Sequence, residues 1–179
     1  MAGVDGRVAL SALDLLGLAE QRKVARLDLS TVGYSGVVYA CDLTAAQQQK
    51  IMSGPRKGKT RIHRDGAMDV DWADLPQDAA AKFLEACLVT DKTEGETLER
   101  AFAALDTSEA EDDKTAYITL PASELVLMSE LMVAELKQPR LVREKLEQFP
   151  NAVTSLIVRT VREISGMVED RVEEKKDNS

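Results

Sequence analysis

The stretch Val24–Leu43, VARLDLSTVGYSGVVYACDL, decides the fold. Apolar and polar residues alternate in its first part, and its last part, from Val37, is rich in β-branched and aromatic residues. Two glycines, Gly33 and Gly36, lie between these parts and favour a turn. The stretch therefore predicts a β-hairpin.

Helical patterns follow the hairpin. In Thr44-Ala-Ala-Gln47 the threonine hydroxyl can accept a backbone N–H of the first helical turn, while the glutamine side chain can bond to the backbone N–H of the threonine. This pattern predicts the start of a helix, which we expect to end near Met52. Apolar residues then recur at helical spacing in several segments, and Tyr117–Leu120 is an extended stretch. The further predicted helices are Gln77–Val89, a short one around Leu98–Leu105, Ser123–Lys137, Leu141–Phe149 and a longer one that starts at Asn151.

These elements predict an α+β fold that is mostly α-helical, with a small N-terminal β-hairpin packed on a bundle of about five helices. The length of 179 residues suits a single domain. We expect this domain to divide into an N-terminal arm (1–23), the hairpin and its helix (24–52), a basic then acidic loop (53–75), a helical region (76–168) and a charged tail (169–179).

Composition excludes several classes of protein. The net charge of −8 argues against a surface that grips nucleic acid as a whole, and aromatic residues are only 4%, so the core is built from Leu, Val, Ala, Ile and Met. Two distant cysteines and one histidine disfavour a metal site or a catalytic triad. No apolar run approaches a membrane span, and we see no secretory signal. We therefore expect a cytoplasmic protein that is not an enzyme, with no cofactor, no metal and no membrane partner.

A basic loop, Gly54–Arg64, is the first candidate site. Its five cations could contact phosphates, or they could pair with an acidic surface of a neighbouring copy, but a mobile loop without a dedicated ligand is favoured. The spacing of its glycines before Lys59-Thr60 does not match a phosphate-binding loop. The cations are Arg56, Lys57, Lys59, Arg61 and Arg64.

The apolar helices of the last third are the second candidate site, because a helix that is apolar nearly all round is either buried or covers a partner. For any single residue a place in the core is favoured, yet methionines also suit surfaces that accept varied apolar partners. The candidate partner-binding residues are Leu125, Met128, Met132, Leu136, Ile157, Val161 and Ile164.

Three segments together resemble the tail assembly chaperones of long-tailed bacteriophages. Gly33-Tyr-Ser-Gly-Val-Val-Tyr-Ala-Cys-Asp-Leu-Thr44 resembles the opening of that family, a hairpin with a glycine-containing turn that leads to a capped helix. Phe83–Asp91 is similar to its next apolar helix and acidic turn, and Phe149–Gly166 to its final helix. The resemblance covers about half of the chain, and the basic loop looks like an insertion.

The resemblance implies a non-catalytic role: binding the long, apolar, helical tape measure protein and aiding polymerisation of the tail tube around it. The implied partners are the tape measure protein and the tail tube protein, with self-association as a further option. Two alternatives stay open, a structural connector or adaptor subunit of a virion or other assembly, and a nucleic-acid-binding regulator that uses the basic loop, although nucleic acid is the less favoured partner.

Overall fold

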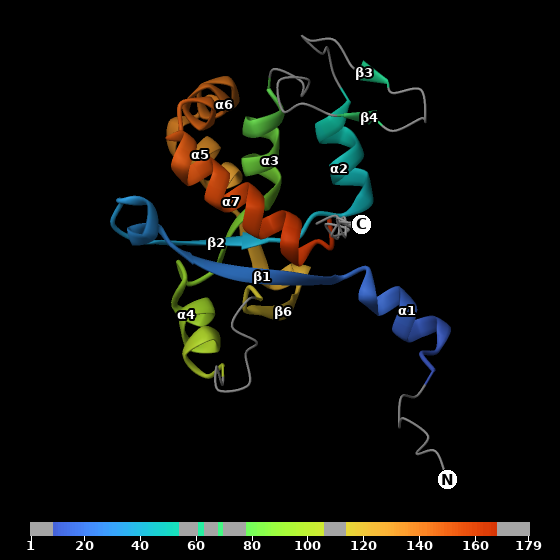
Figure 1. The fold of residues 1–179 in the computed structure, drawn as a ribbon. Coiled ribbons are helices and arrows are strands. Elements are labelled where there is room, and N and C mark those ends of the chain that lie inside the picture. Colours follow the sequence, from blue (N-terminus) through green and yellow to red (C-terminus); the bar gives the residue numbers. More distant parts are fainter. Residues whose placement is uncertain (1–8, 54–60, 63–67, 70–77, 106–113, 168–179) are drawn as a thin grey trace, which may run out of the picture.

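The computed structural model describes residues 9–53, 61–62, 68–69, 78–105 and 114–167. These residues form a mixed, helix-rich α+β fold around a five-stranded antiparallel sheet, which confirms the predicted fold class. Figure 1 shows α2, α3, α5, α6 and α7 on one side of the sheet and α4 on the other. The strand order is β6-β1-β2-β5-β7, with β1 Gln21–Asp28, β2 Val37–Cys41, β5 Leu88–Asp91, β6 Tyr117–Pro121 and β7 Leu125–Leu127.

The predicted hairpin lies at the centre of this sheet. β1 and β2 pair in antiparallel register, with Val24 opposite Cys41 and Leu27 opposite Val38. Between them the 3-10 helix η1 (Leu29–Val32) ends at Gly33, whose φ of 88° is a left-handed conformation that glycine adopts without strain. The hairpin is thus confirmed, but it carries three further strands.

The sheet is strongly curved. β6 pairs with β1 at one edge and β7 pairs with β5 at the other, yet only the 3-10 helix η4 (Ala122–Glu124) separates β6 from β7 in the chain. In a flat sheet these edges would lie about 19 Å apart, because neighbouring strands are about 4.8 Å apart. Three residues in a helical turn cannot span that distance. The sheet therefore curls, so that the single bent segment 117–127 provides the strands at both of its edges, β6 and β7.

The two faces of the curved sheet enclose two separate cores. The inner face and α4 (Glu96–Ala103) surround a small core. The outer face, through residues such as Ala25 and Leu27, packs against α7 and shares a larger core with α2, α3 and α6. Alternation along β1 and β2 explains this division, because successive side chains of a strand point to opposite faces. The small core contains Val24, Tyr39, Cys41, Val89 and Leu98.

Several helices start or end away from their predicted limits. The predicted capping box is present: Thr44 and Gln47 bond reciprocally at the start of α2. The arm is shorter than predicted, since β1 begins at Gln21, and residues 123–127 lie in the 3-10 helix η4 and the strand β7 rather than in an α-helix. The helices are α1 Ala12–Leu18, α2 Ala45–Met52, α3 Ala79–Cys87, α4 Glu96–Ala103, α5 Met128–Leu136, α6 Pro139–Glu147 and α7 Asn151–Ile164.

Candidate functional site: a groove between α3, α5 and α6

A tight helix–helix connection creates the candidate site. α5 ends at Lys137, which adopts a left-handed conformation with φ of 55°, and α6 begins two residues later with Pro139 at its first position. Proline suits that position because the first helical N–H groups have no intrahelical partner. The short connection holds α5 against α6, and α3 packs against both.

A groove of about 550 Å³ lies where these three helices meet. Val133 of α5 and Val142 of α6 give it an apolar lining together with Pro139. Charged side chains of both signs surround this lining, namely Glu85, Glu130, Arg140 and Arg143, and Ser129 completes the set.

An ion pair fixes one wall of the groove. Arg143 of α6 donates from Nε and Nη2 to the two carboxylate oxygens of Glu85 on α3, over 3.1 and 2.8 Å. Ser129 of α5 donates its hydroxyl to the backbone carbonyl of the same glutamate over 3.2 Å. Both contacts tie α3 to the neighbouring helices along this side of the groove.

Two leucines of α5 are exposed outside the lining of the groove, and one of them, Leu136, lies one helical turn after the lining residue Val133. Leu131 is 42% exposed and Leu136 is 39% exposed, whereas the interior of a helix packed in a domain normally hides such side chains. Met128 and Met132 are half-buried and pack against the larger core. α5 therefore has one side in the core, and its two exposed leucines lie five positions apart, on different sides of the helix.

The structure separates the seven predicted partner-binding residues into three groups. Ile157, Val161 and Ile164 of α7 are buried in the larger core, so a partner cannot reach them without opening the domain. Leu125 is half-buried on β7 and faces the smaller core, where the sequence predicted a helix. Only Met128, Met132 and Leu136 lie on α5, where the two methionines pack against the larger core and Leu136 is exposed near the groove.

The predicted basic loop falls almost entirely outside the described residues. Of its five cations, Arg56, Lys57, Lys59 and Arg64 are not described, and Arg61 is described only as part of β3 (Arg61–Ile62), which pairs with β4 (Met68–Asp69). Whether these cations contact phosphates, pair with an acidic surface or have no dedicated ligand stays a matter of prediction. The predicted charged tail, 169–179, also lies outside the described part of the chain.

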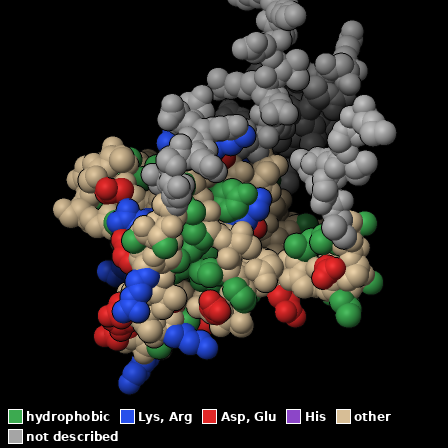
Figure 2. Space-filling view, turned by 90° about the horizontal axis from the view of Figure 1, so that it is seen from below, with side chains coloured by type: hydrophobic (Ala, Val, Ile, Leu, Met, Phe, Trp, Pro, Cys, Tyr) green, Lys and Arg blue, Asp and Glu red, His purple; other side chains and the backbone are tan. Residues whose placement is uncertain are grey.

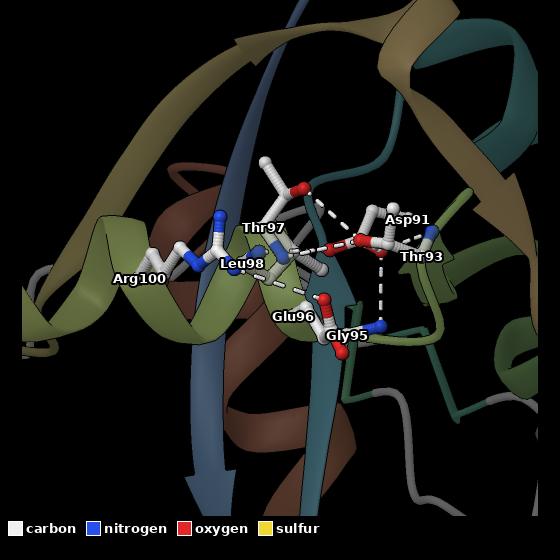
Figure 3. A network of polar contacts seen from close by, with 7 residues as sticks. All are labelled: Asp91, Thr93, Gly95, Glu96, Thr97, Leu98 and Arg100. Atoms are coloured by element: carbon white, nitrogen blue, oxygen red, sulfur yellow. Dashed lines mark hydrogen bonds and ion pairs between the residues drawn. The ribbon is translucent and has the colours of Figure 1, made fainter.

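The densest polar network in the described residues is a helix cap. Asp91, at the end of β5, accepts the N–H of Leu98 over 2.8 Å, the N–H of Gly95 over 3.0 Å, and both the N–H and the hydroxyl of Thr93 (Figure 3). Burial of Asp91 acts to raise the pKa of its carboxyl, but these hydrogen bonds outweigh it and lower the pKa to about 2. A carboxylate with its oxygens so engaged anchors α4 and has no proton to exchange near neutral pH.

The cysteines are equally unsuited to chemistry. Cys41 and Cys87 are free and buried. Burial raises the pKa of the Cys41 thiol to about 11 and also raises that of Cys87, so neither forms the reactive thiolate at neutral pH. Among the described residues no group of three or more His, Cys, Asp or Glu side chains could hold a metal ion.

Sequence reasoning missed the groove's own lining. Val133 and Val142 lie in predicted helices and Pro139 falls between two of them, but the proximity of these three residues depends on the left-handed turn at Lys137, for which the sequence offers no glycine. No protein-family model, curated protein or solved structure matches the chain. In the described part of the chain no helix is both long and apolar enough to cross a membrane.

Proposed function

We propose that this chain is a non-catalytic tail assembly chaperone of a long-tailed bacteriophage. It acts in the host cytoplasm, where it binds the apolar helical tape measure protein and promotes assembly of the tail tube. The observation that carries the proposal is the groove between α3, α5 and α6, with the exposed Leu136 one helical turn after its lining residue Val133.

The groove suits an apolar helix as its occupant. Helix-in-groove recognition places a row of apolar side chains against a hydrophobic cleft between helices. Val133 and Val142 provide the apolar contact, and Leu136, one helical turn after Val133, extends it along α5. The mixed charges around the groove can pair with the polar side of such a helix, and the net charge of −8 helps to keep the complex soluble.

The resemblance to tail assembly chaperones concerns the scaffold that holds the groove. Its first segment corresponds to the end of η1, the strand β2 and the cap of α2, and its other two segments correspond to α3 with β5 and to α7. These elements contribute most of the larger core. The resemblance and the groove are thus independent lines of support, one for the family and one for the mode of binding.

Co-expression with a candidate tape measure protein and a candidate tail tube protein tests the proposal. We expect the chain to copurify with the tape measure protein, and Leu136→Asp to weaken that copurification. Met52→Asp is the matched control, because Met52 is exposed to a similar degree, 37%, at the end of α2. The control should leave binding intact.

Two outcomes would overturn this function in favour of the alternatives. Stoichiometric presence of the chain in purified particles by mass spectrometry would indicate a structural connector or adaptor subunit. Binding of DNA or RNA that collapses with added salt, and with neutralisation of Arg56, Lys57, Lys59, Arg61 and Arg64, would indicate a nucleic-acid-binding regulator.

A further inference from the structure

The four charged side chains of the groove between α3, α5 and α6 are not equally engaged. Glu85 and Arg143 are committed to each other, because both carboxylate oxygens accept N–H groups of the same guanidinium over 3.1 and 2.8 Å. Arg140 of α6 contacts Glu144 of its own helix over 3.4 Å, and the Arg140 side chain is 93% exposed. Glu130 of α5 is also exposed, and the described residues give it no ion-pair partner. The groove therefore offers two charges to a partner, Glu130 and Arg140.

These two charges lie towards opposite ends of the groove. Glu130 lies in the first turn of α5, whereas Arg140 lies in the first turn of α6, directly after the turn that ends α5 at Lys137. A helix rises about 1.5 Å per residue, so the stretch of α5 from Glu130 to Lys137 spans about 10 Å. The lining residue Val133 lies between Glu130 and Lys137 on α5. A partner that follows α5 therefore meets an anion first, then an apolar surface, then a cation.

The face of the molecule on the side of α4 has a different distribution. Figure 2 shows hydrophobic side chains in the middle and at the right of that face, and Lys and Arg side chains mainly at its left. Cations and apolar surface are thus largely separate there. In the groove, by contrast, charges of both signs surround one apolar lining.

We propose that the groove selects an amphipathic helix whose apolar face carries a cation and an anion about seven positions apart. The cation lies beside Glu130, the anion lies beside Arg140, and the apolar side chains between them contact Val133. A span of about 10 Å corresponds to about seven residues of the partner helix, and residues two turns apart share one face. The selection rests on the proposed function, because it specifies which segments of an apolar helical partner the groove accepts.

The exposure of both charges decides what they contribute. Exposed ion pairs add little to affinity, because water screens them, but they discriminate strongly against like charges. A helix with two cations is repelled at Arg140, and a helix with two anions is repelled at Glu130. Arg140 can accept a partner's carboxylate at little cost, since the Glu144 side chain that it contacts is itself 52% exposed.

Three synthetic helical peptides of one design test the selection against the full chain. Each carries the same apolar residues and one pair of charged residues seven positions apart: Lys with Glu, Lys with Lys, or Glu with Glu. By fluorescence anisotropy at low salt, we expect the mixed peptide to bind about 3-fold or more tighter than either uniform peptide. High salt should reduce this difference, because the charges in the groove are exposed.

Reversal of each charge in the chain should exchange the preference. Glu130→Lys should make the peptide with two Glu residues the tightest, and Arg140→Glu should do the same for the peptide with two Lys residues. Glu135→Lys and Lys145→Glu are matched controls, because they make the same changes of charge at exposed positions of α5 and α6 outside the lining of the groove. Both controls should keep the preference for the mixed peptide.

The results distinguish failure of the selection from failure of the proposed function. Copurification with a tape measure protein, together with equal binding of the three peptides or a ranking that the reversals leave unchanged, would overturn the selection alone. The expected ranking without copurification would overturn the function alone. If no peptide bound the full chain, the groove would be closed to a helix or covered by the chain itself, and the selection would be wrong.

Discussion

Tyr39 on β2 donates its phenolic hydrogen to the Glu99 carboxylate on α4 over 2.7 Å. Arg26, the cross-strand neighbour of Tyr39 on β1, donates from Nε and Nη2 to the same carboxylate over 2.7–2.9 Å. The Tyr39 ring also stacks on Phe102 of α4, with ring centroids 5.9 Å apart. These contacts lock α4 over the inner face of the curved sheet.

This contact makes Tyr39 titrate late. Burial, and then the hydrogen bond to Glu99, raise the pKa of Tyr39 to about 12. Because the unfolded tyrosine titrates near pH 10, the stability linked to Tyr39 is present below pH 10 and is lost as the pH rises towards 12. In a Tyr34→Phe, Tyr117→Phe background, ultraviolet titration should show that Glu99→Gln lowers the Tyr39 pKa partway to 10. An unchanged titration would contradict the role of Glu99.

The carboxylate of Asp91 gives a second pH dependence, at the acid end. Its pKa of about 2, against 3.8 for an ordinary aspartate, means that its contribution is fully present above about pH 4. That contribution is lost as the pH falls towards 2. We expect Asp91→Asn to lower the free energy of unfolding by about 2 kcal/mol at neutral pH and to flatten the acid limb of the stability profile. Urea unfolding between pH 7 and pH 2 measures both effects.

The control for Asp91 is Glu94→Gln in the same turn. It removes one negative charge from an exposed side chain and leaves the cap untouched. If Glu94→Gln changed stability as much as Asp91→Asn, net charge and not the cap would explain the effect.

Local signals located the starts of elements in this chain. Thr44 and Gln47 satisfy orphan N–H groups through their own side chains, so the start of α2 was readable from four adjacent residues. No such local signal predicted the strands β5 and β7. Leu88–Asp91 is buried throughout and Leu125–Leu127 is a short apolar run, and such runs match a buried strand and a helix turn equally well.

The candidate site was less predictable than the fold. Ile157 and Leu136 both recur at helical spacing in apolar helices, yet one is in the core and the other is 39% exposed. Their difference depends on which helices α5 and α7 pack against, and that depends on the curved sheet and the turn at Lys137. The leucines of α1 were visible in the sequence, but only their exposure in the folded chain distinguishes them from core residues.

This contrast predicts losses of very different size when two leucine-sized side chains are truncated. Ile157 is fully buried, so Ile157→Ala should lower the free energy of unfolding by about 2–5 kcal/mol. Leu136→Ala should cost less than about 1 kcal/mol because its side chain already contacts water. Urea unfolding of both variants measures this difference. Similar losses at the two positions would mean that α5 is buried more deeply than the structure shows.

Gly33 tests the backbone of the hairpin turn. Its φ is 88°, and a Cβ there would meet no atom within 4 Å, so the cost of a side chain comes from the backbone alone. Gly33→Ala should lower stability by about 1 kcal/mol, and Gly33→Asn should lower it less, because asparagine tolerates the left-handed region. Ser35→Ala in the same turn is the control. A larger loss for Asn than for Ala would show that side-chain sterics, and not φ, limit this position.

The ion pair between Arg143 and Glu85 tests the rigidity of the groove wall. Their side chains are 44% and 25% exposed, so solvent screens the pair and its coupling free energy should be about 0.5–1 kcal/mol in spite of the two-pronged geometry. A double-mutant cycle with Glu85→Gln and Arg143→Gln isolates that coupling from the loss of each side chain's packing. Added salt should reduce the coupling, whereas the matched helical pair Arg140–Glu144, which is more exposed, should give a smaller value. If both pairs coupled equally weakly, the wall of the groove would depend on the apolar contacts between α3 and α6 alone, and Arg143 would be free to pair with a bound helix instead.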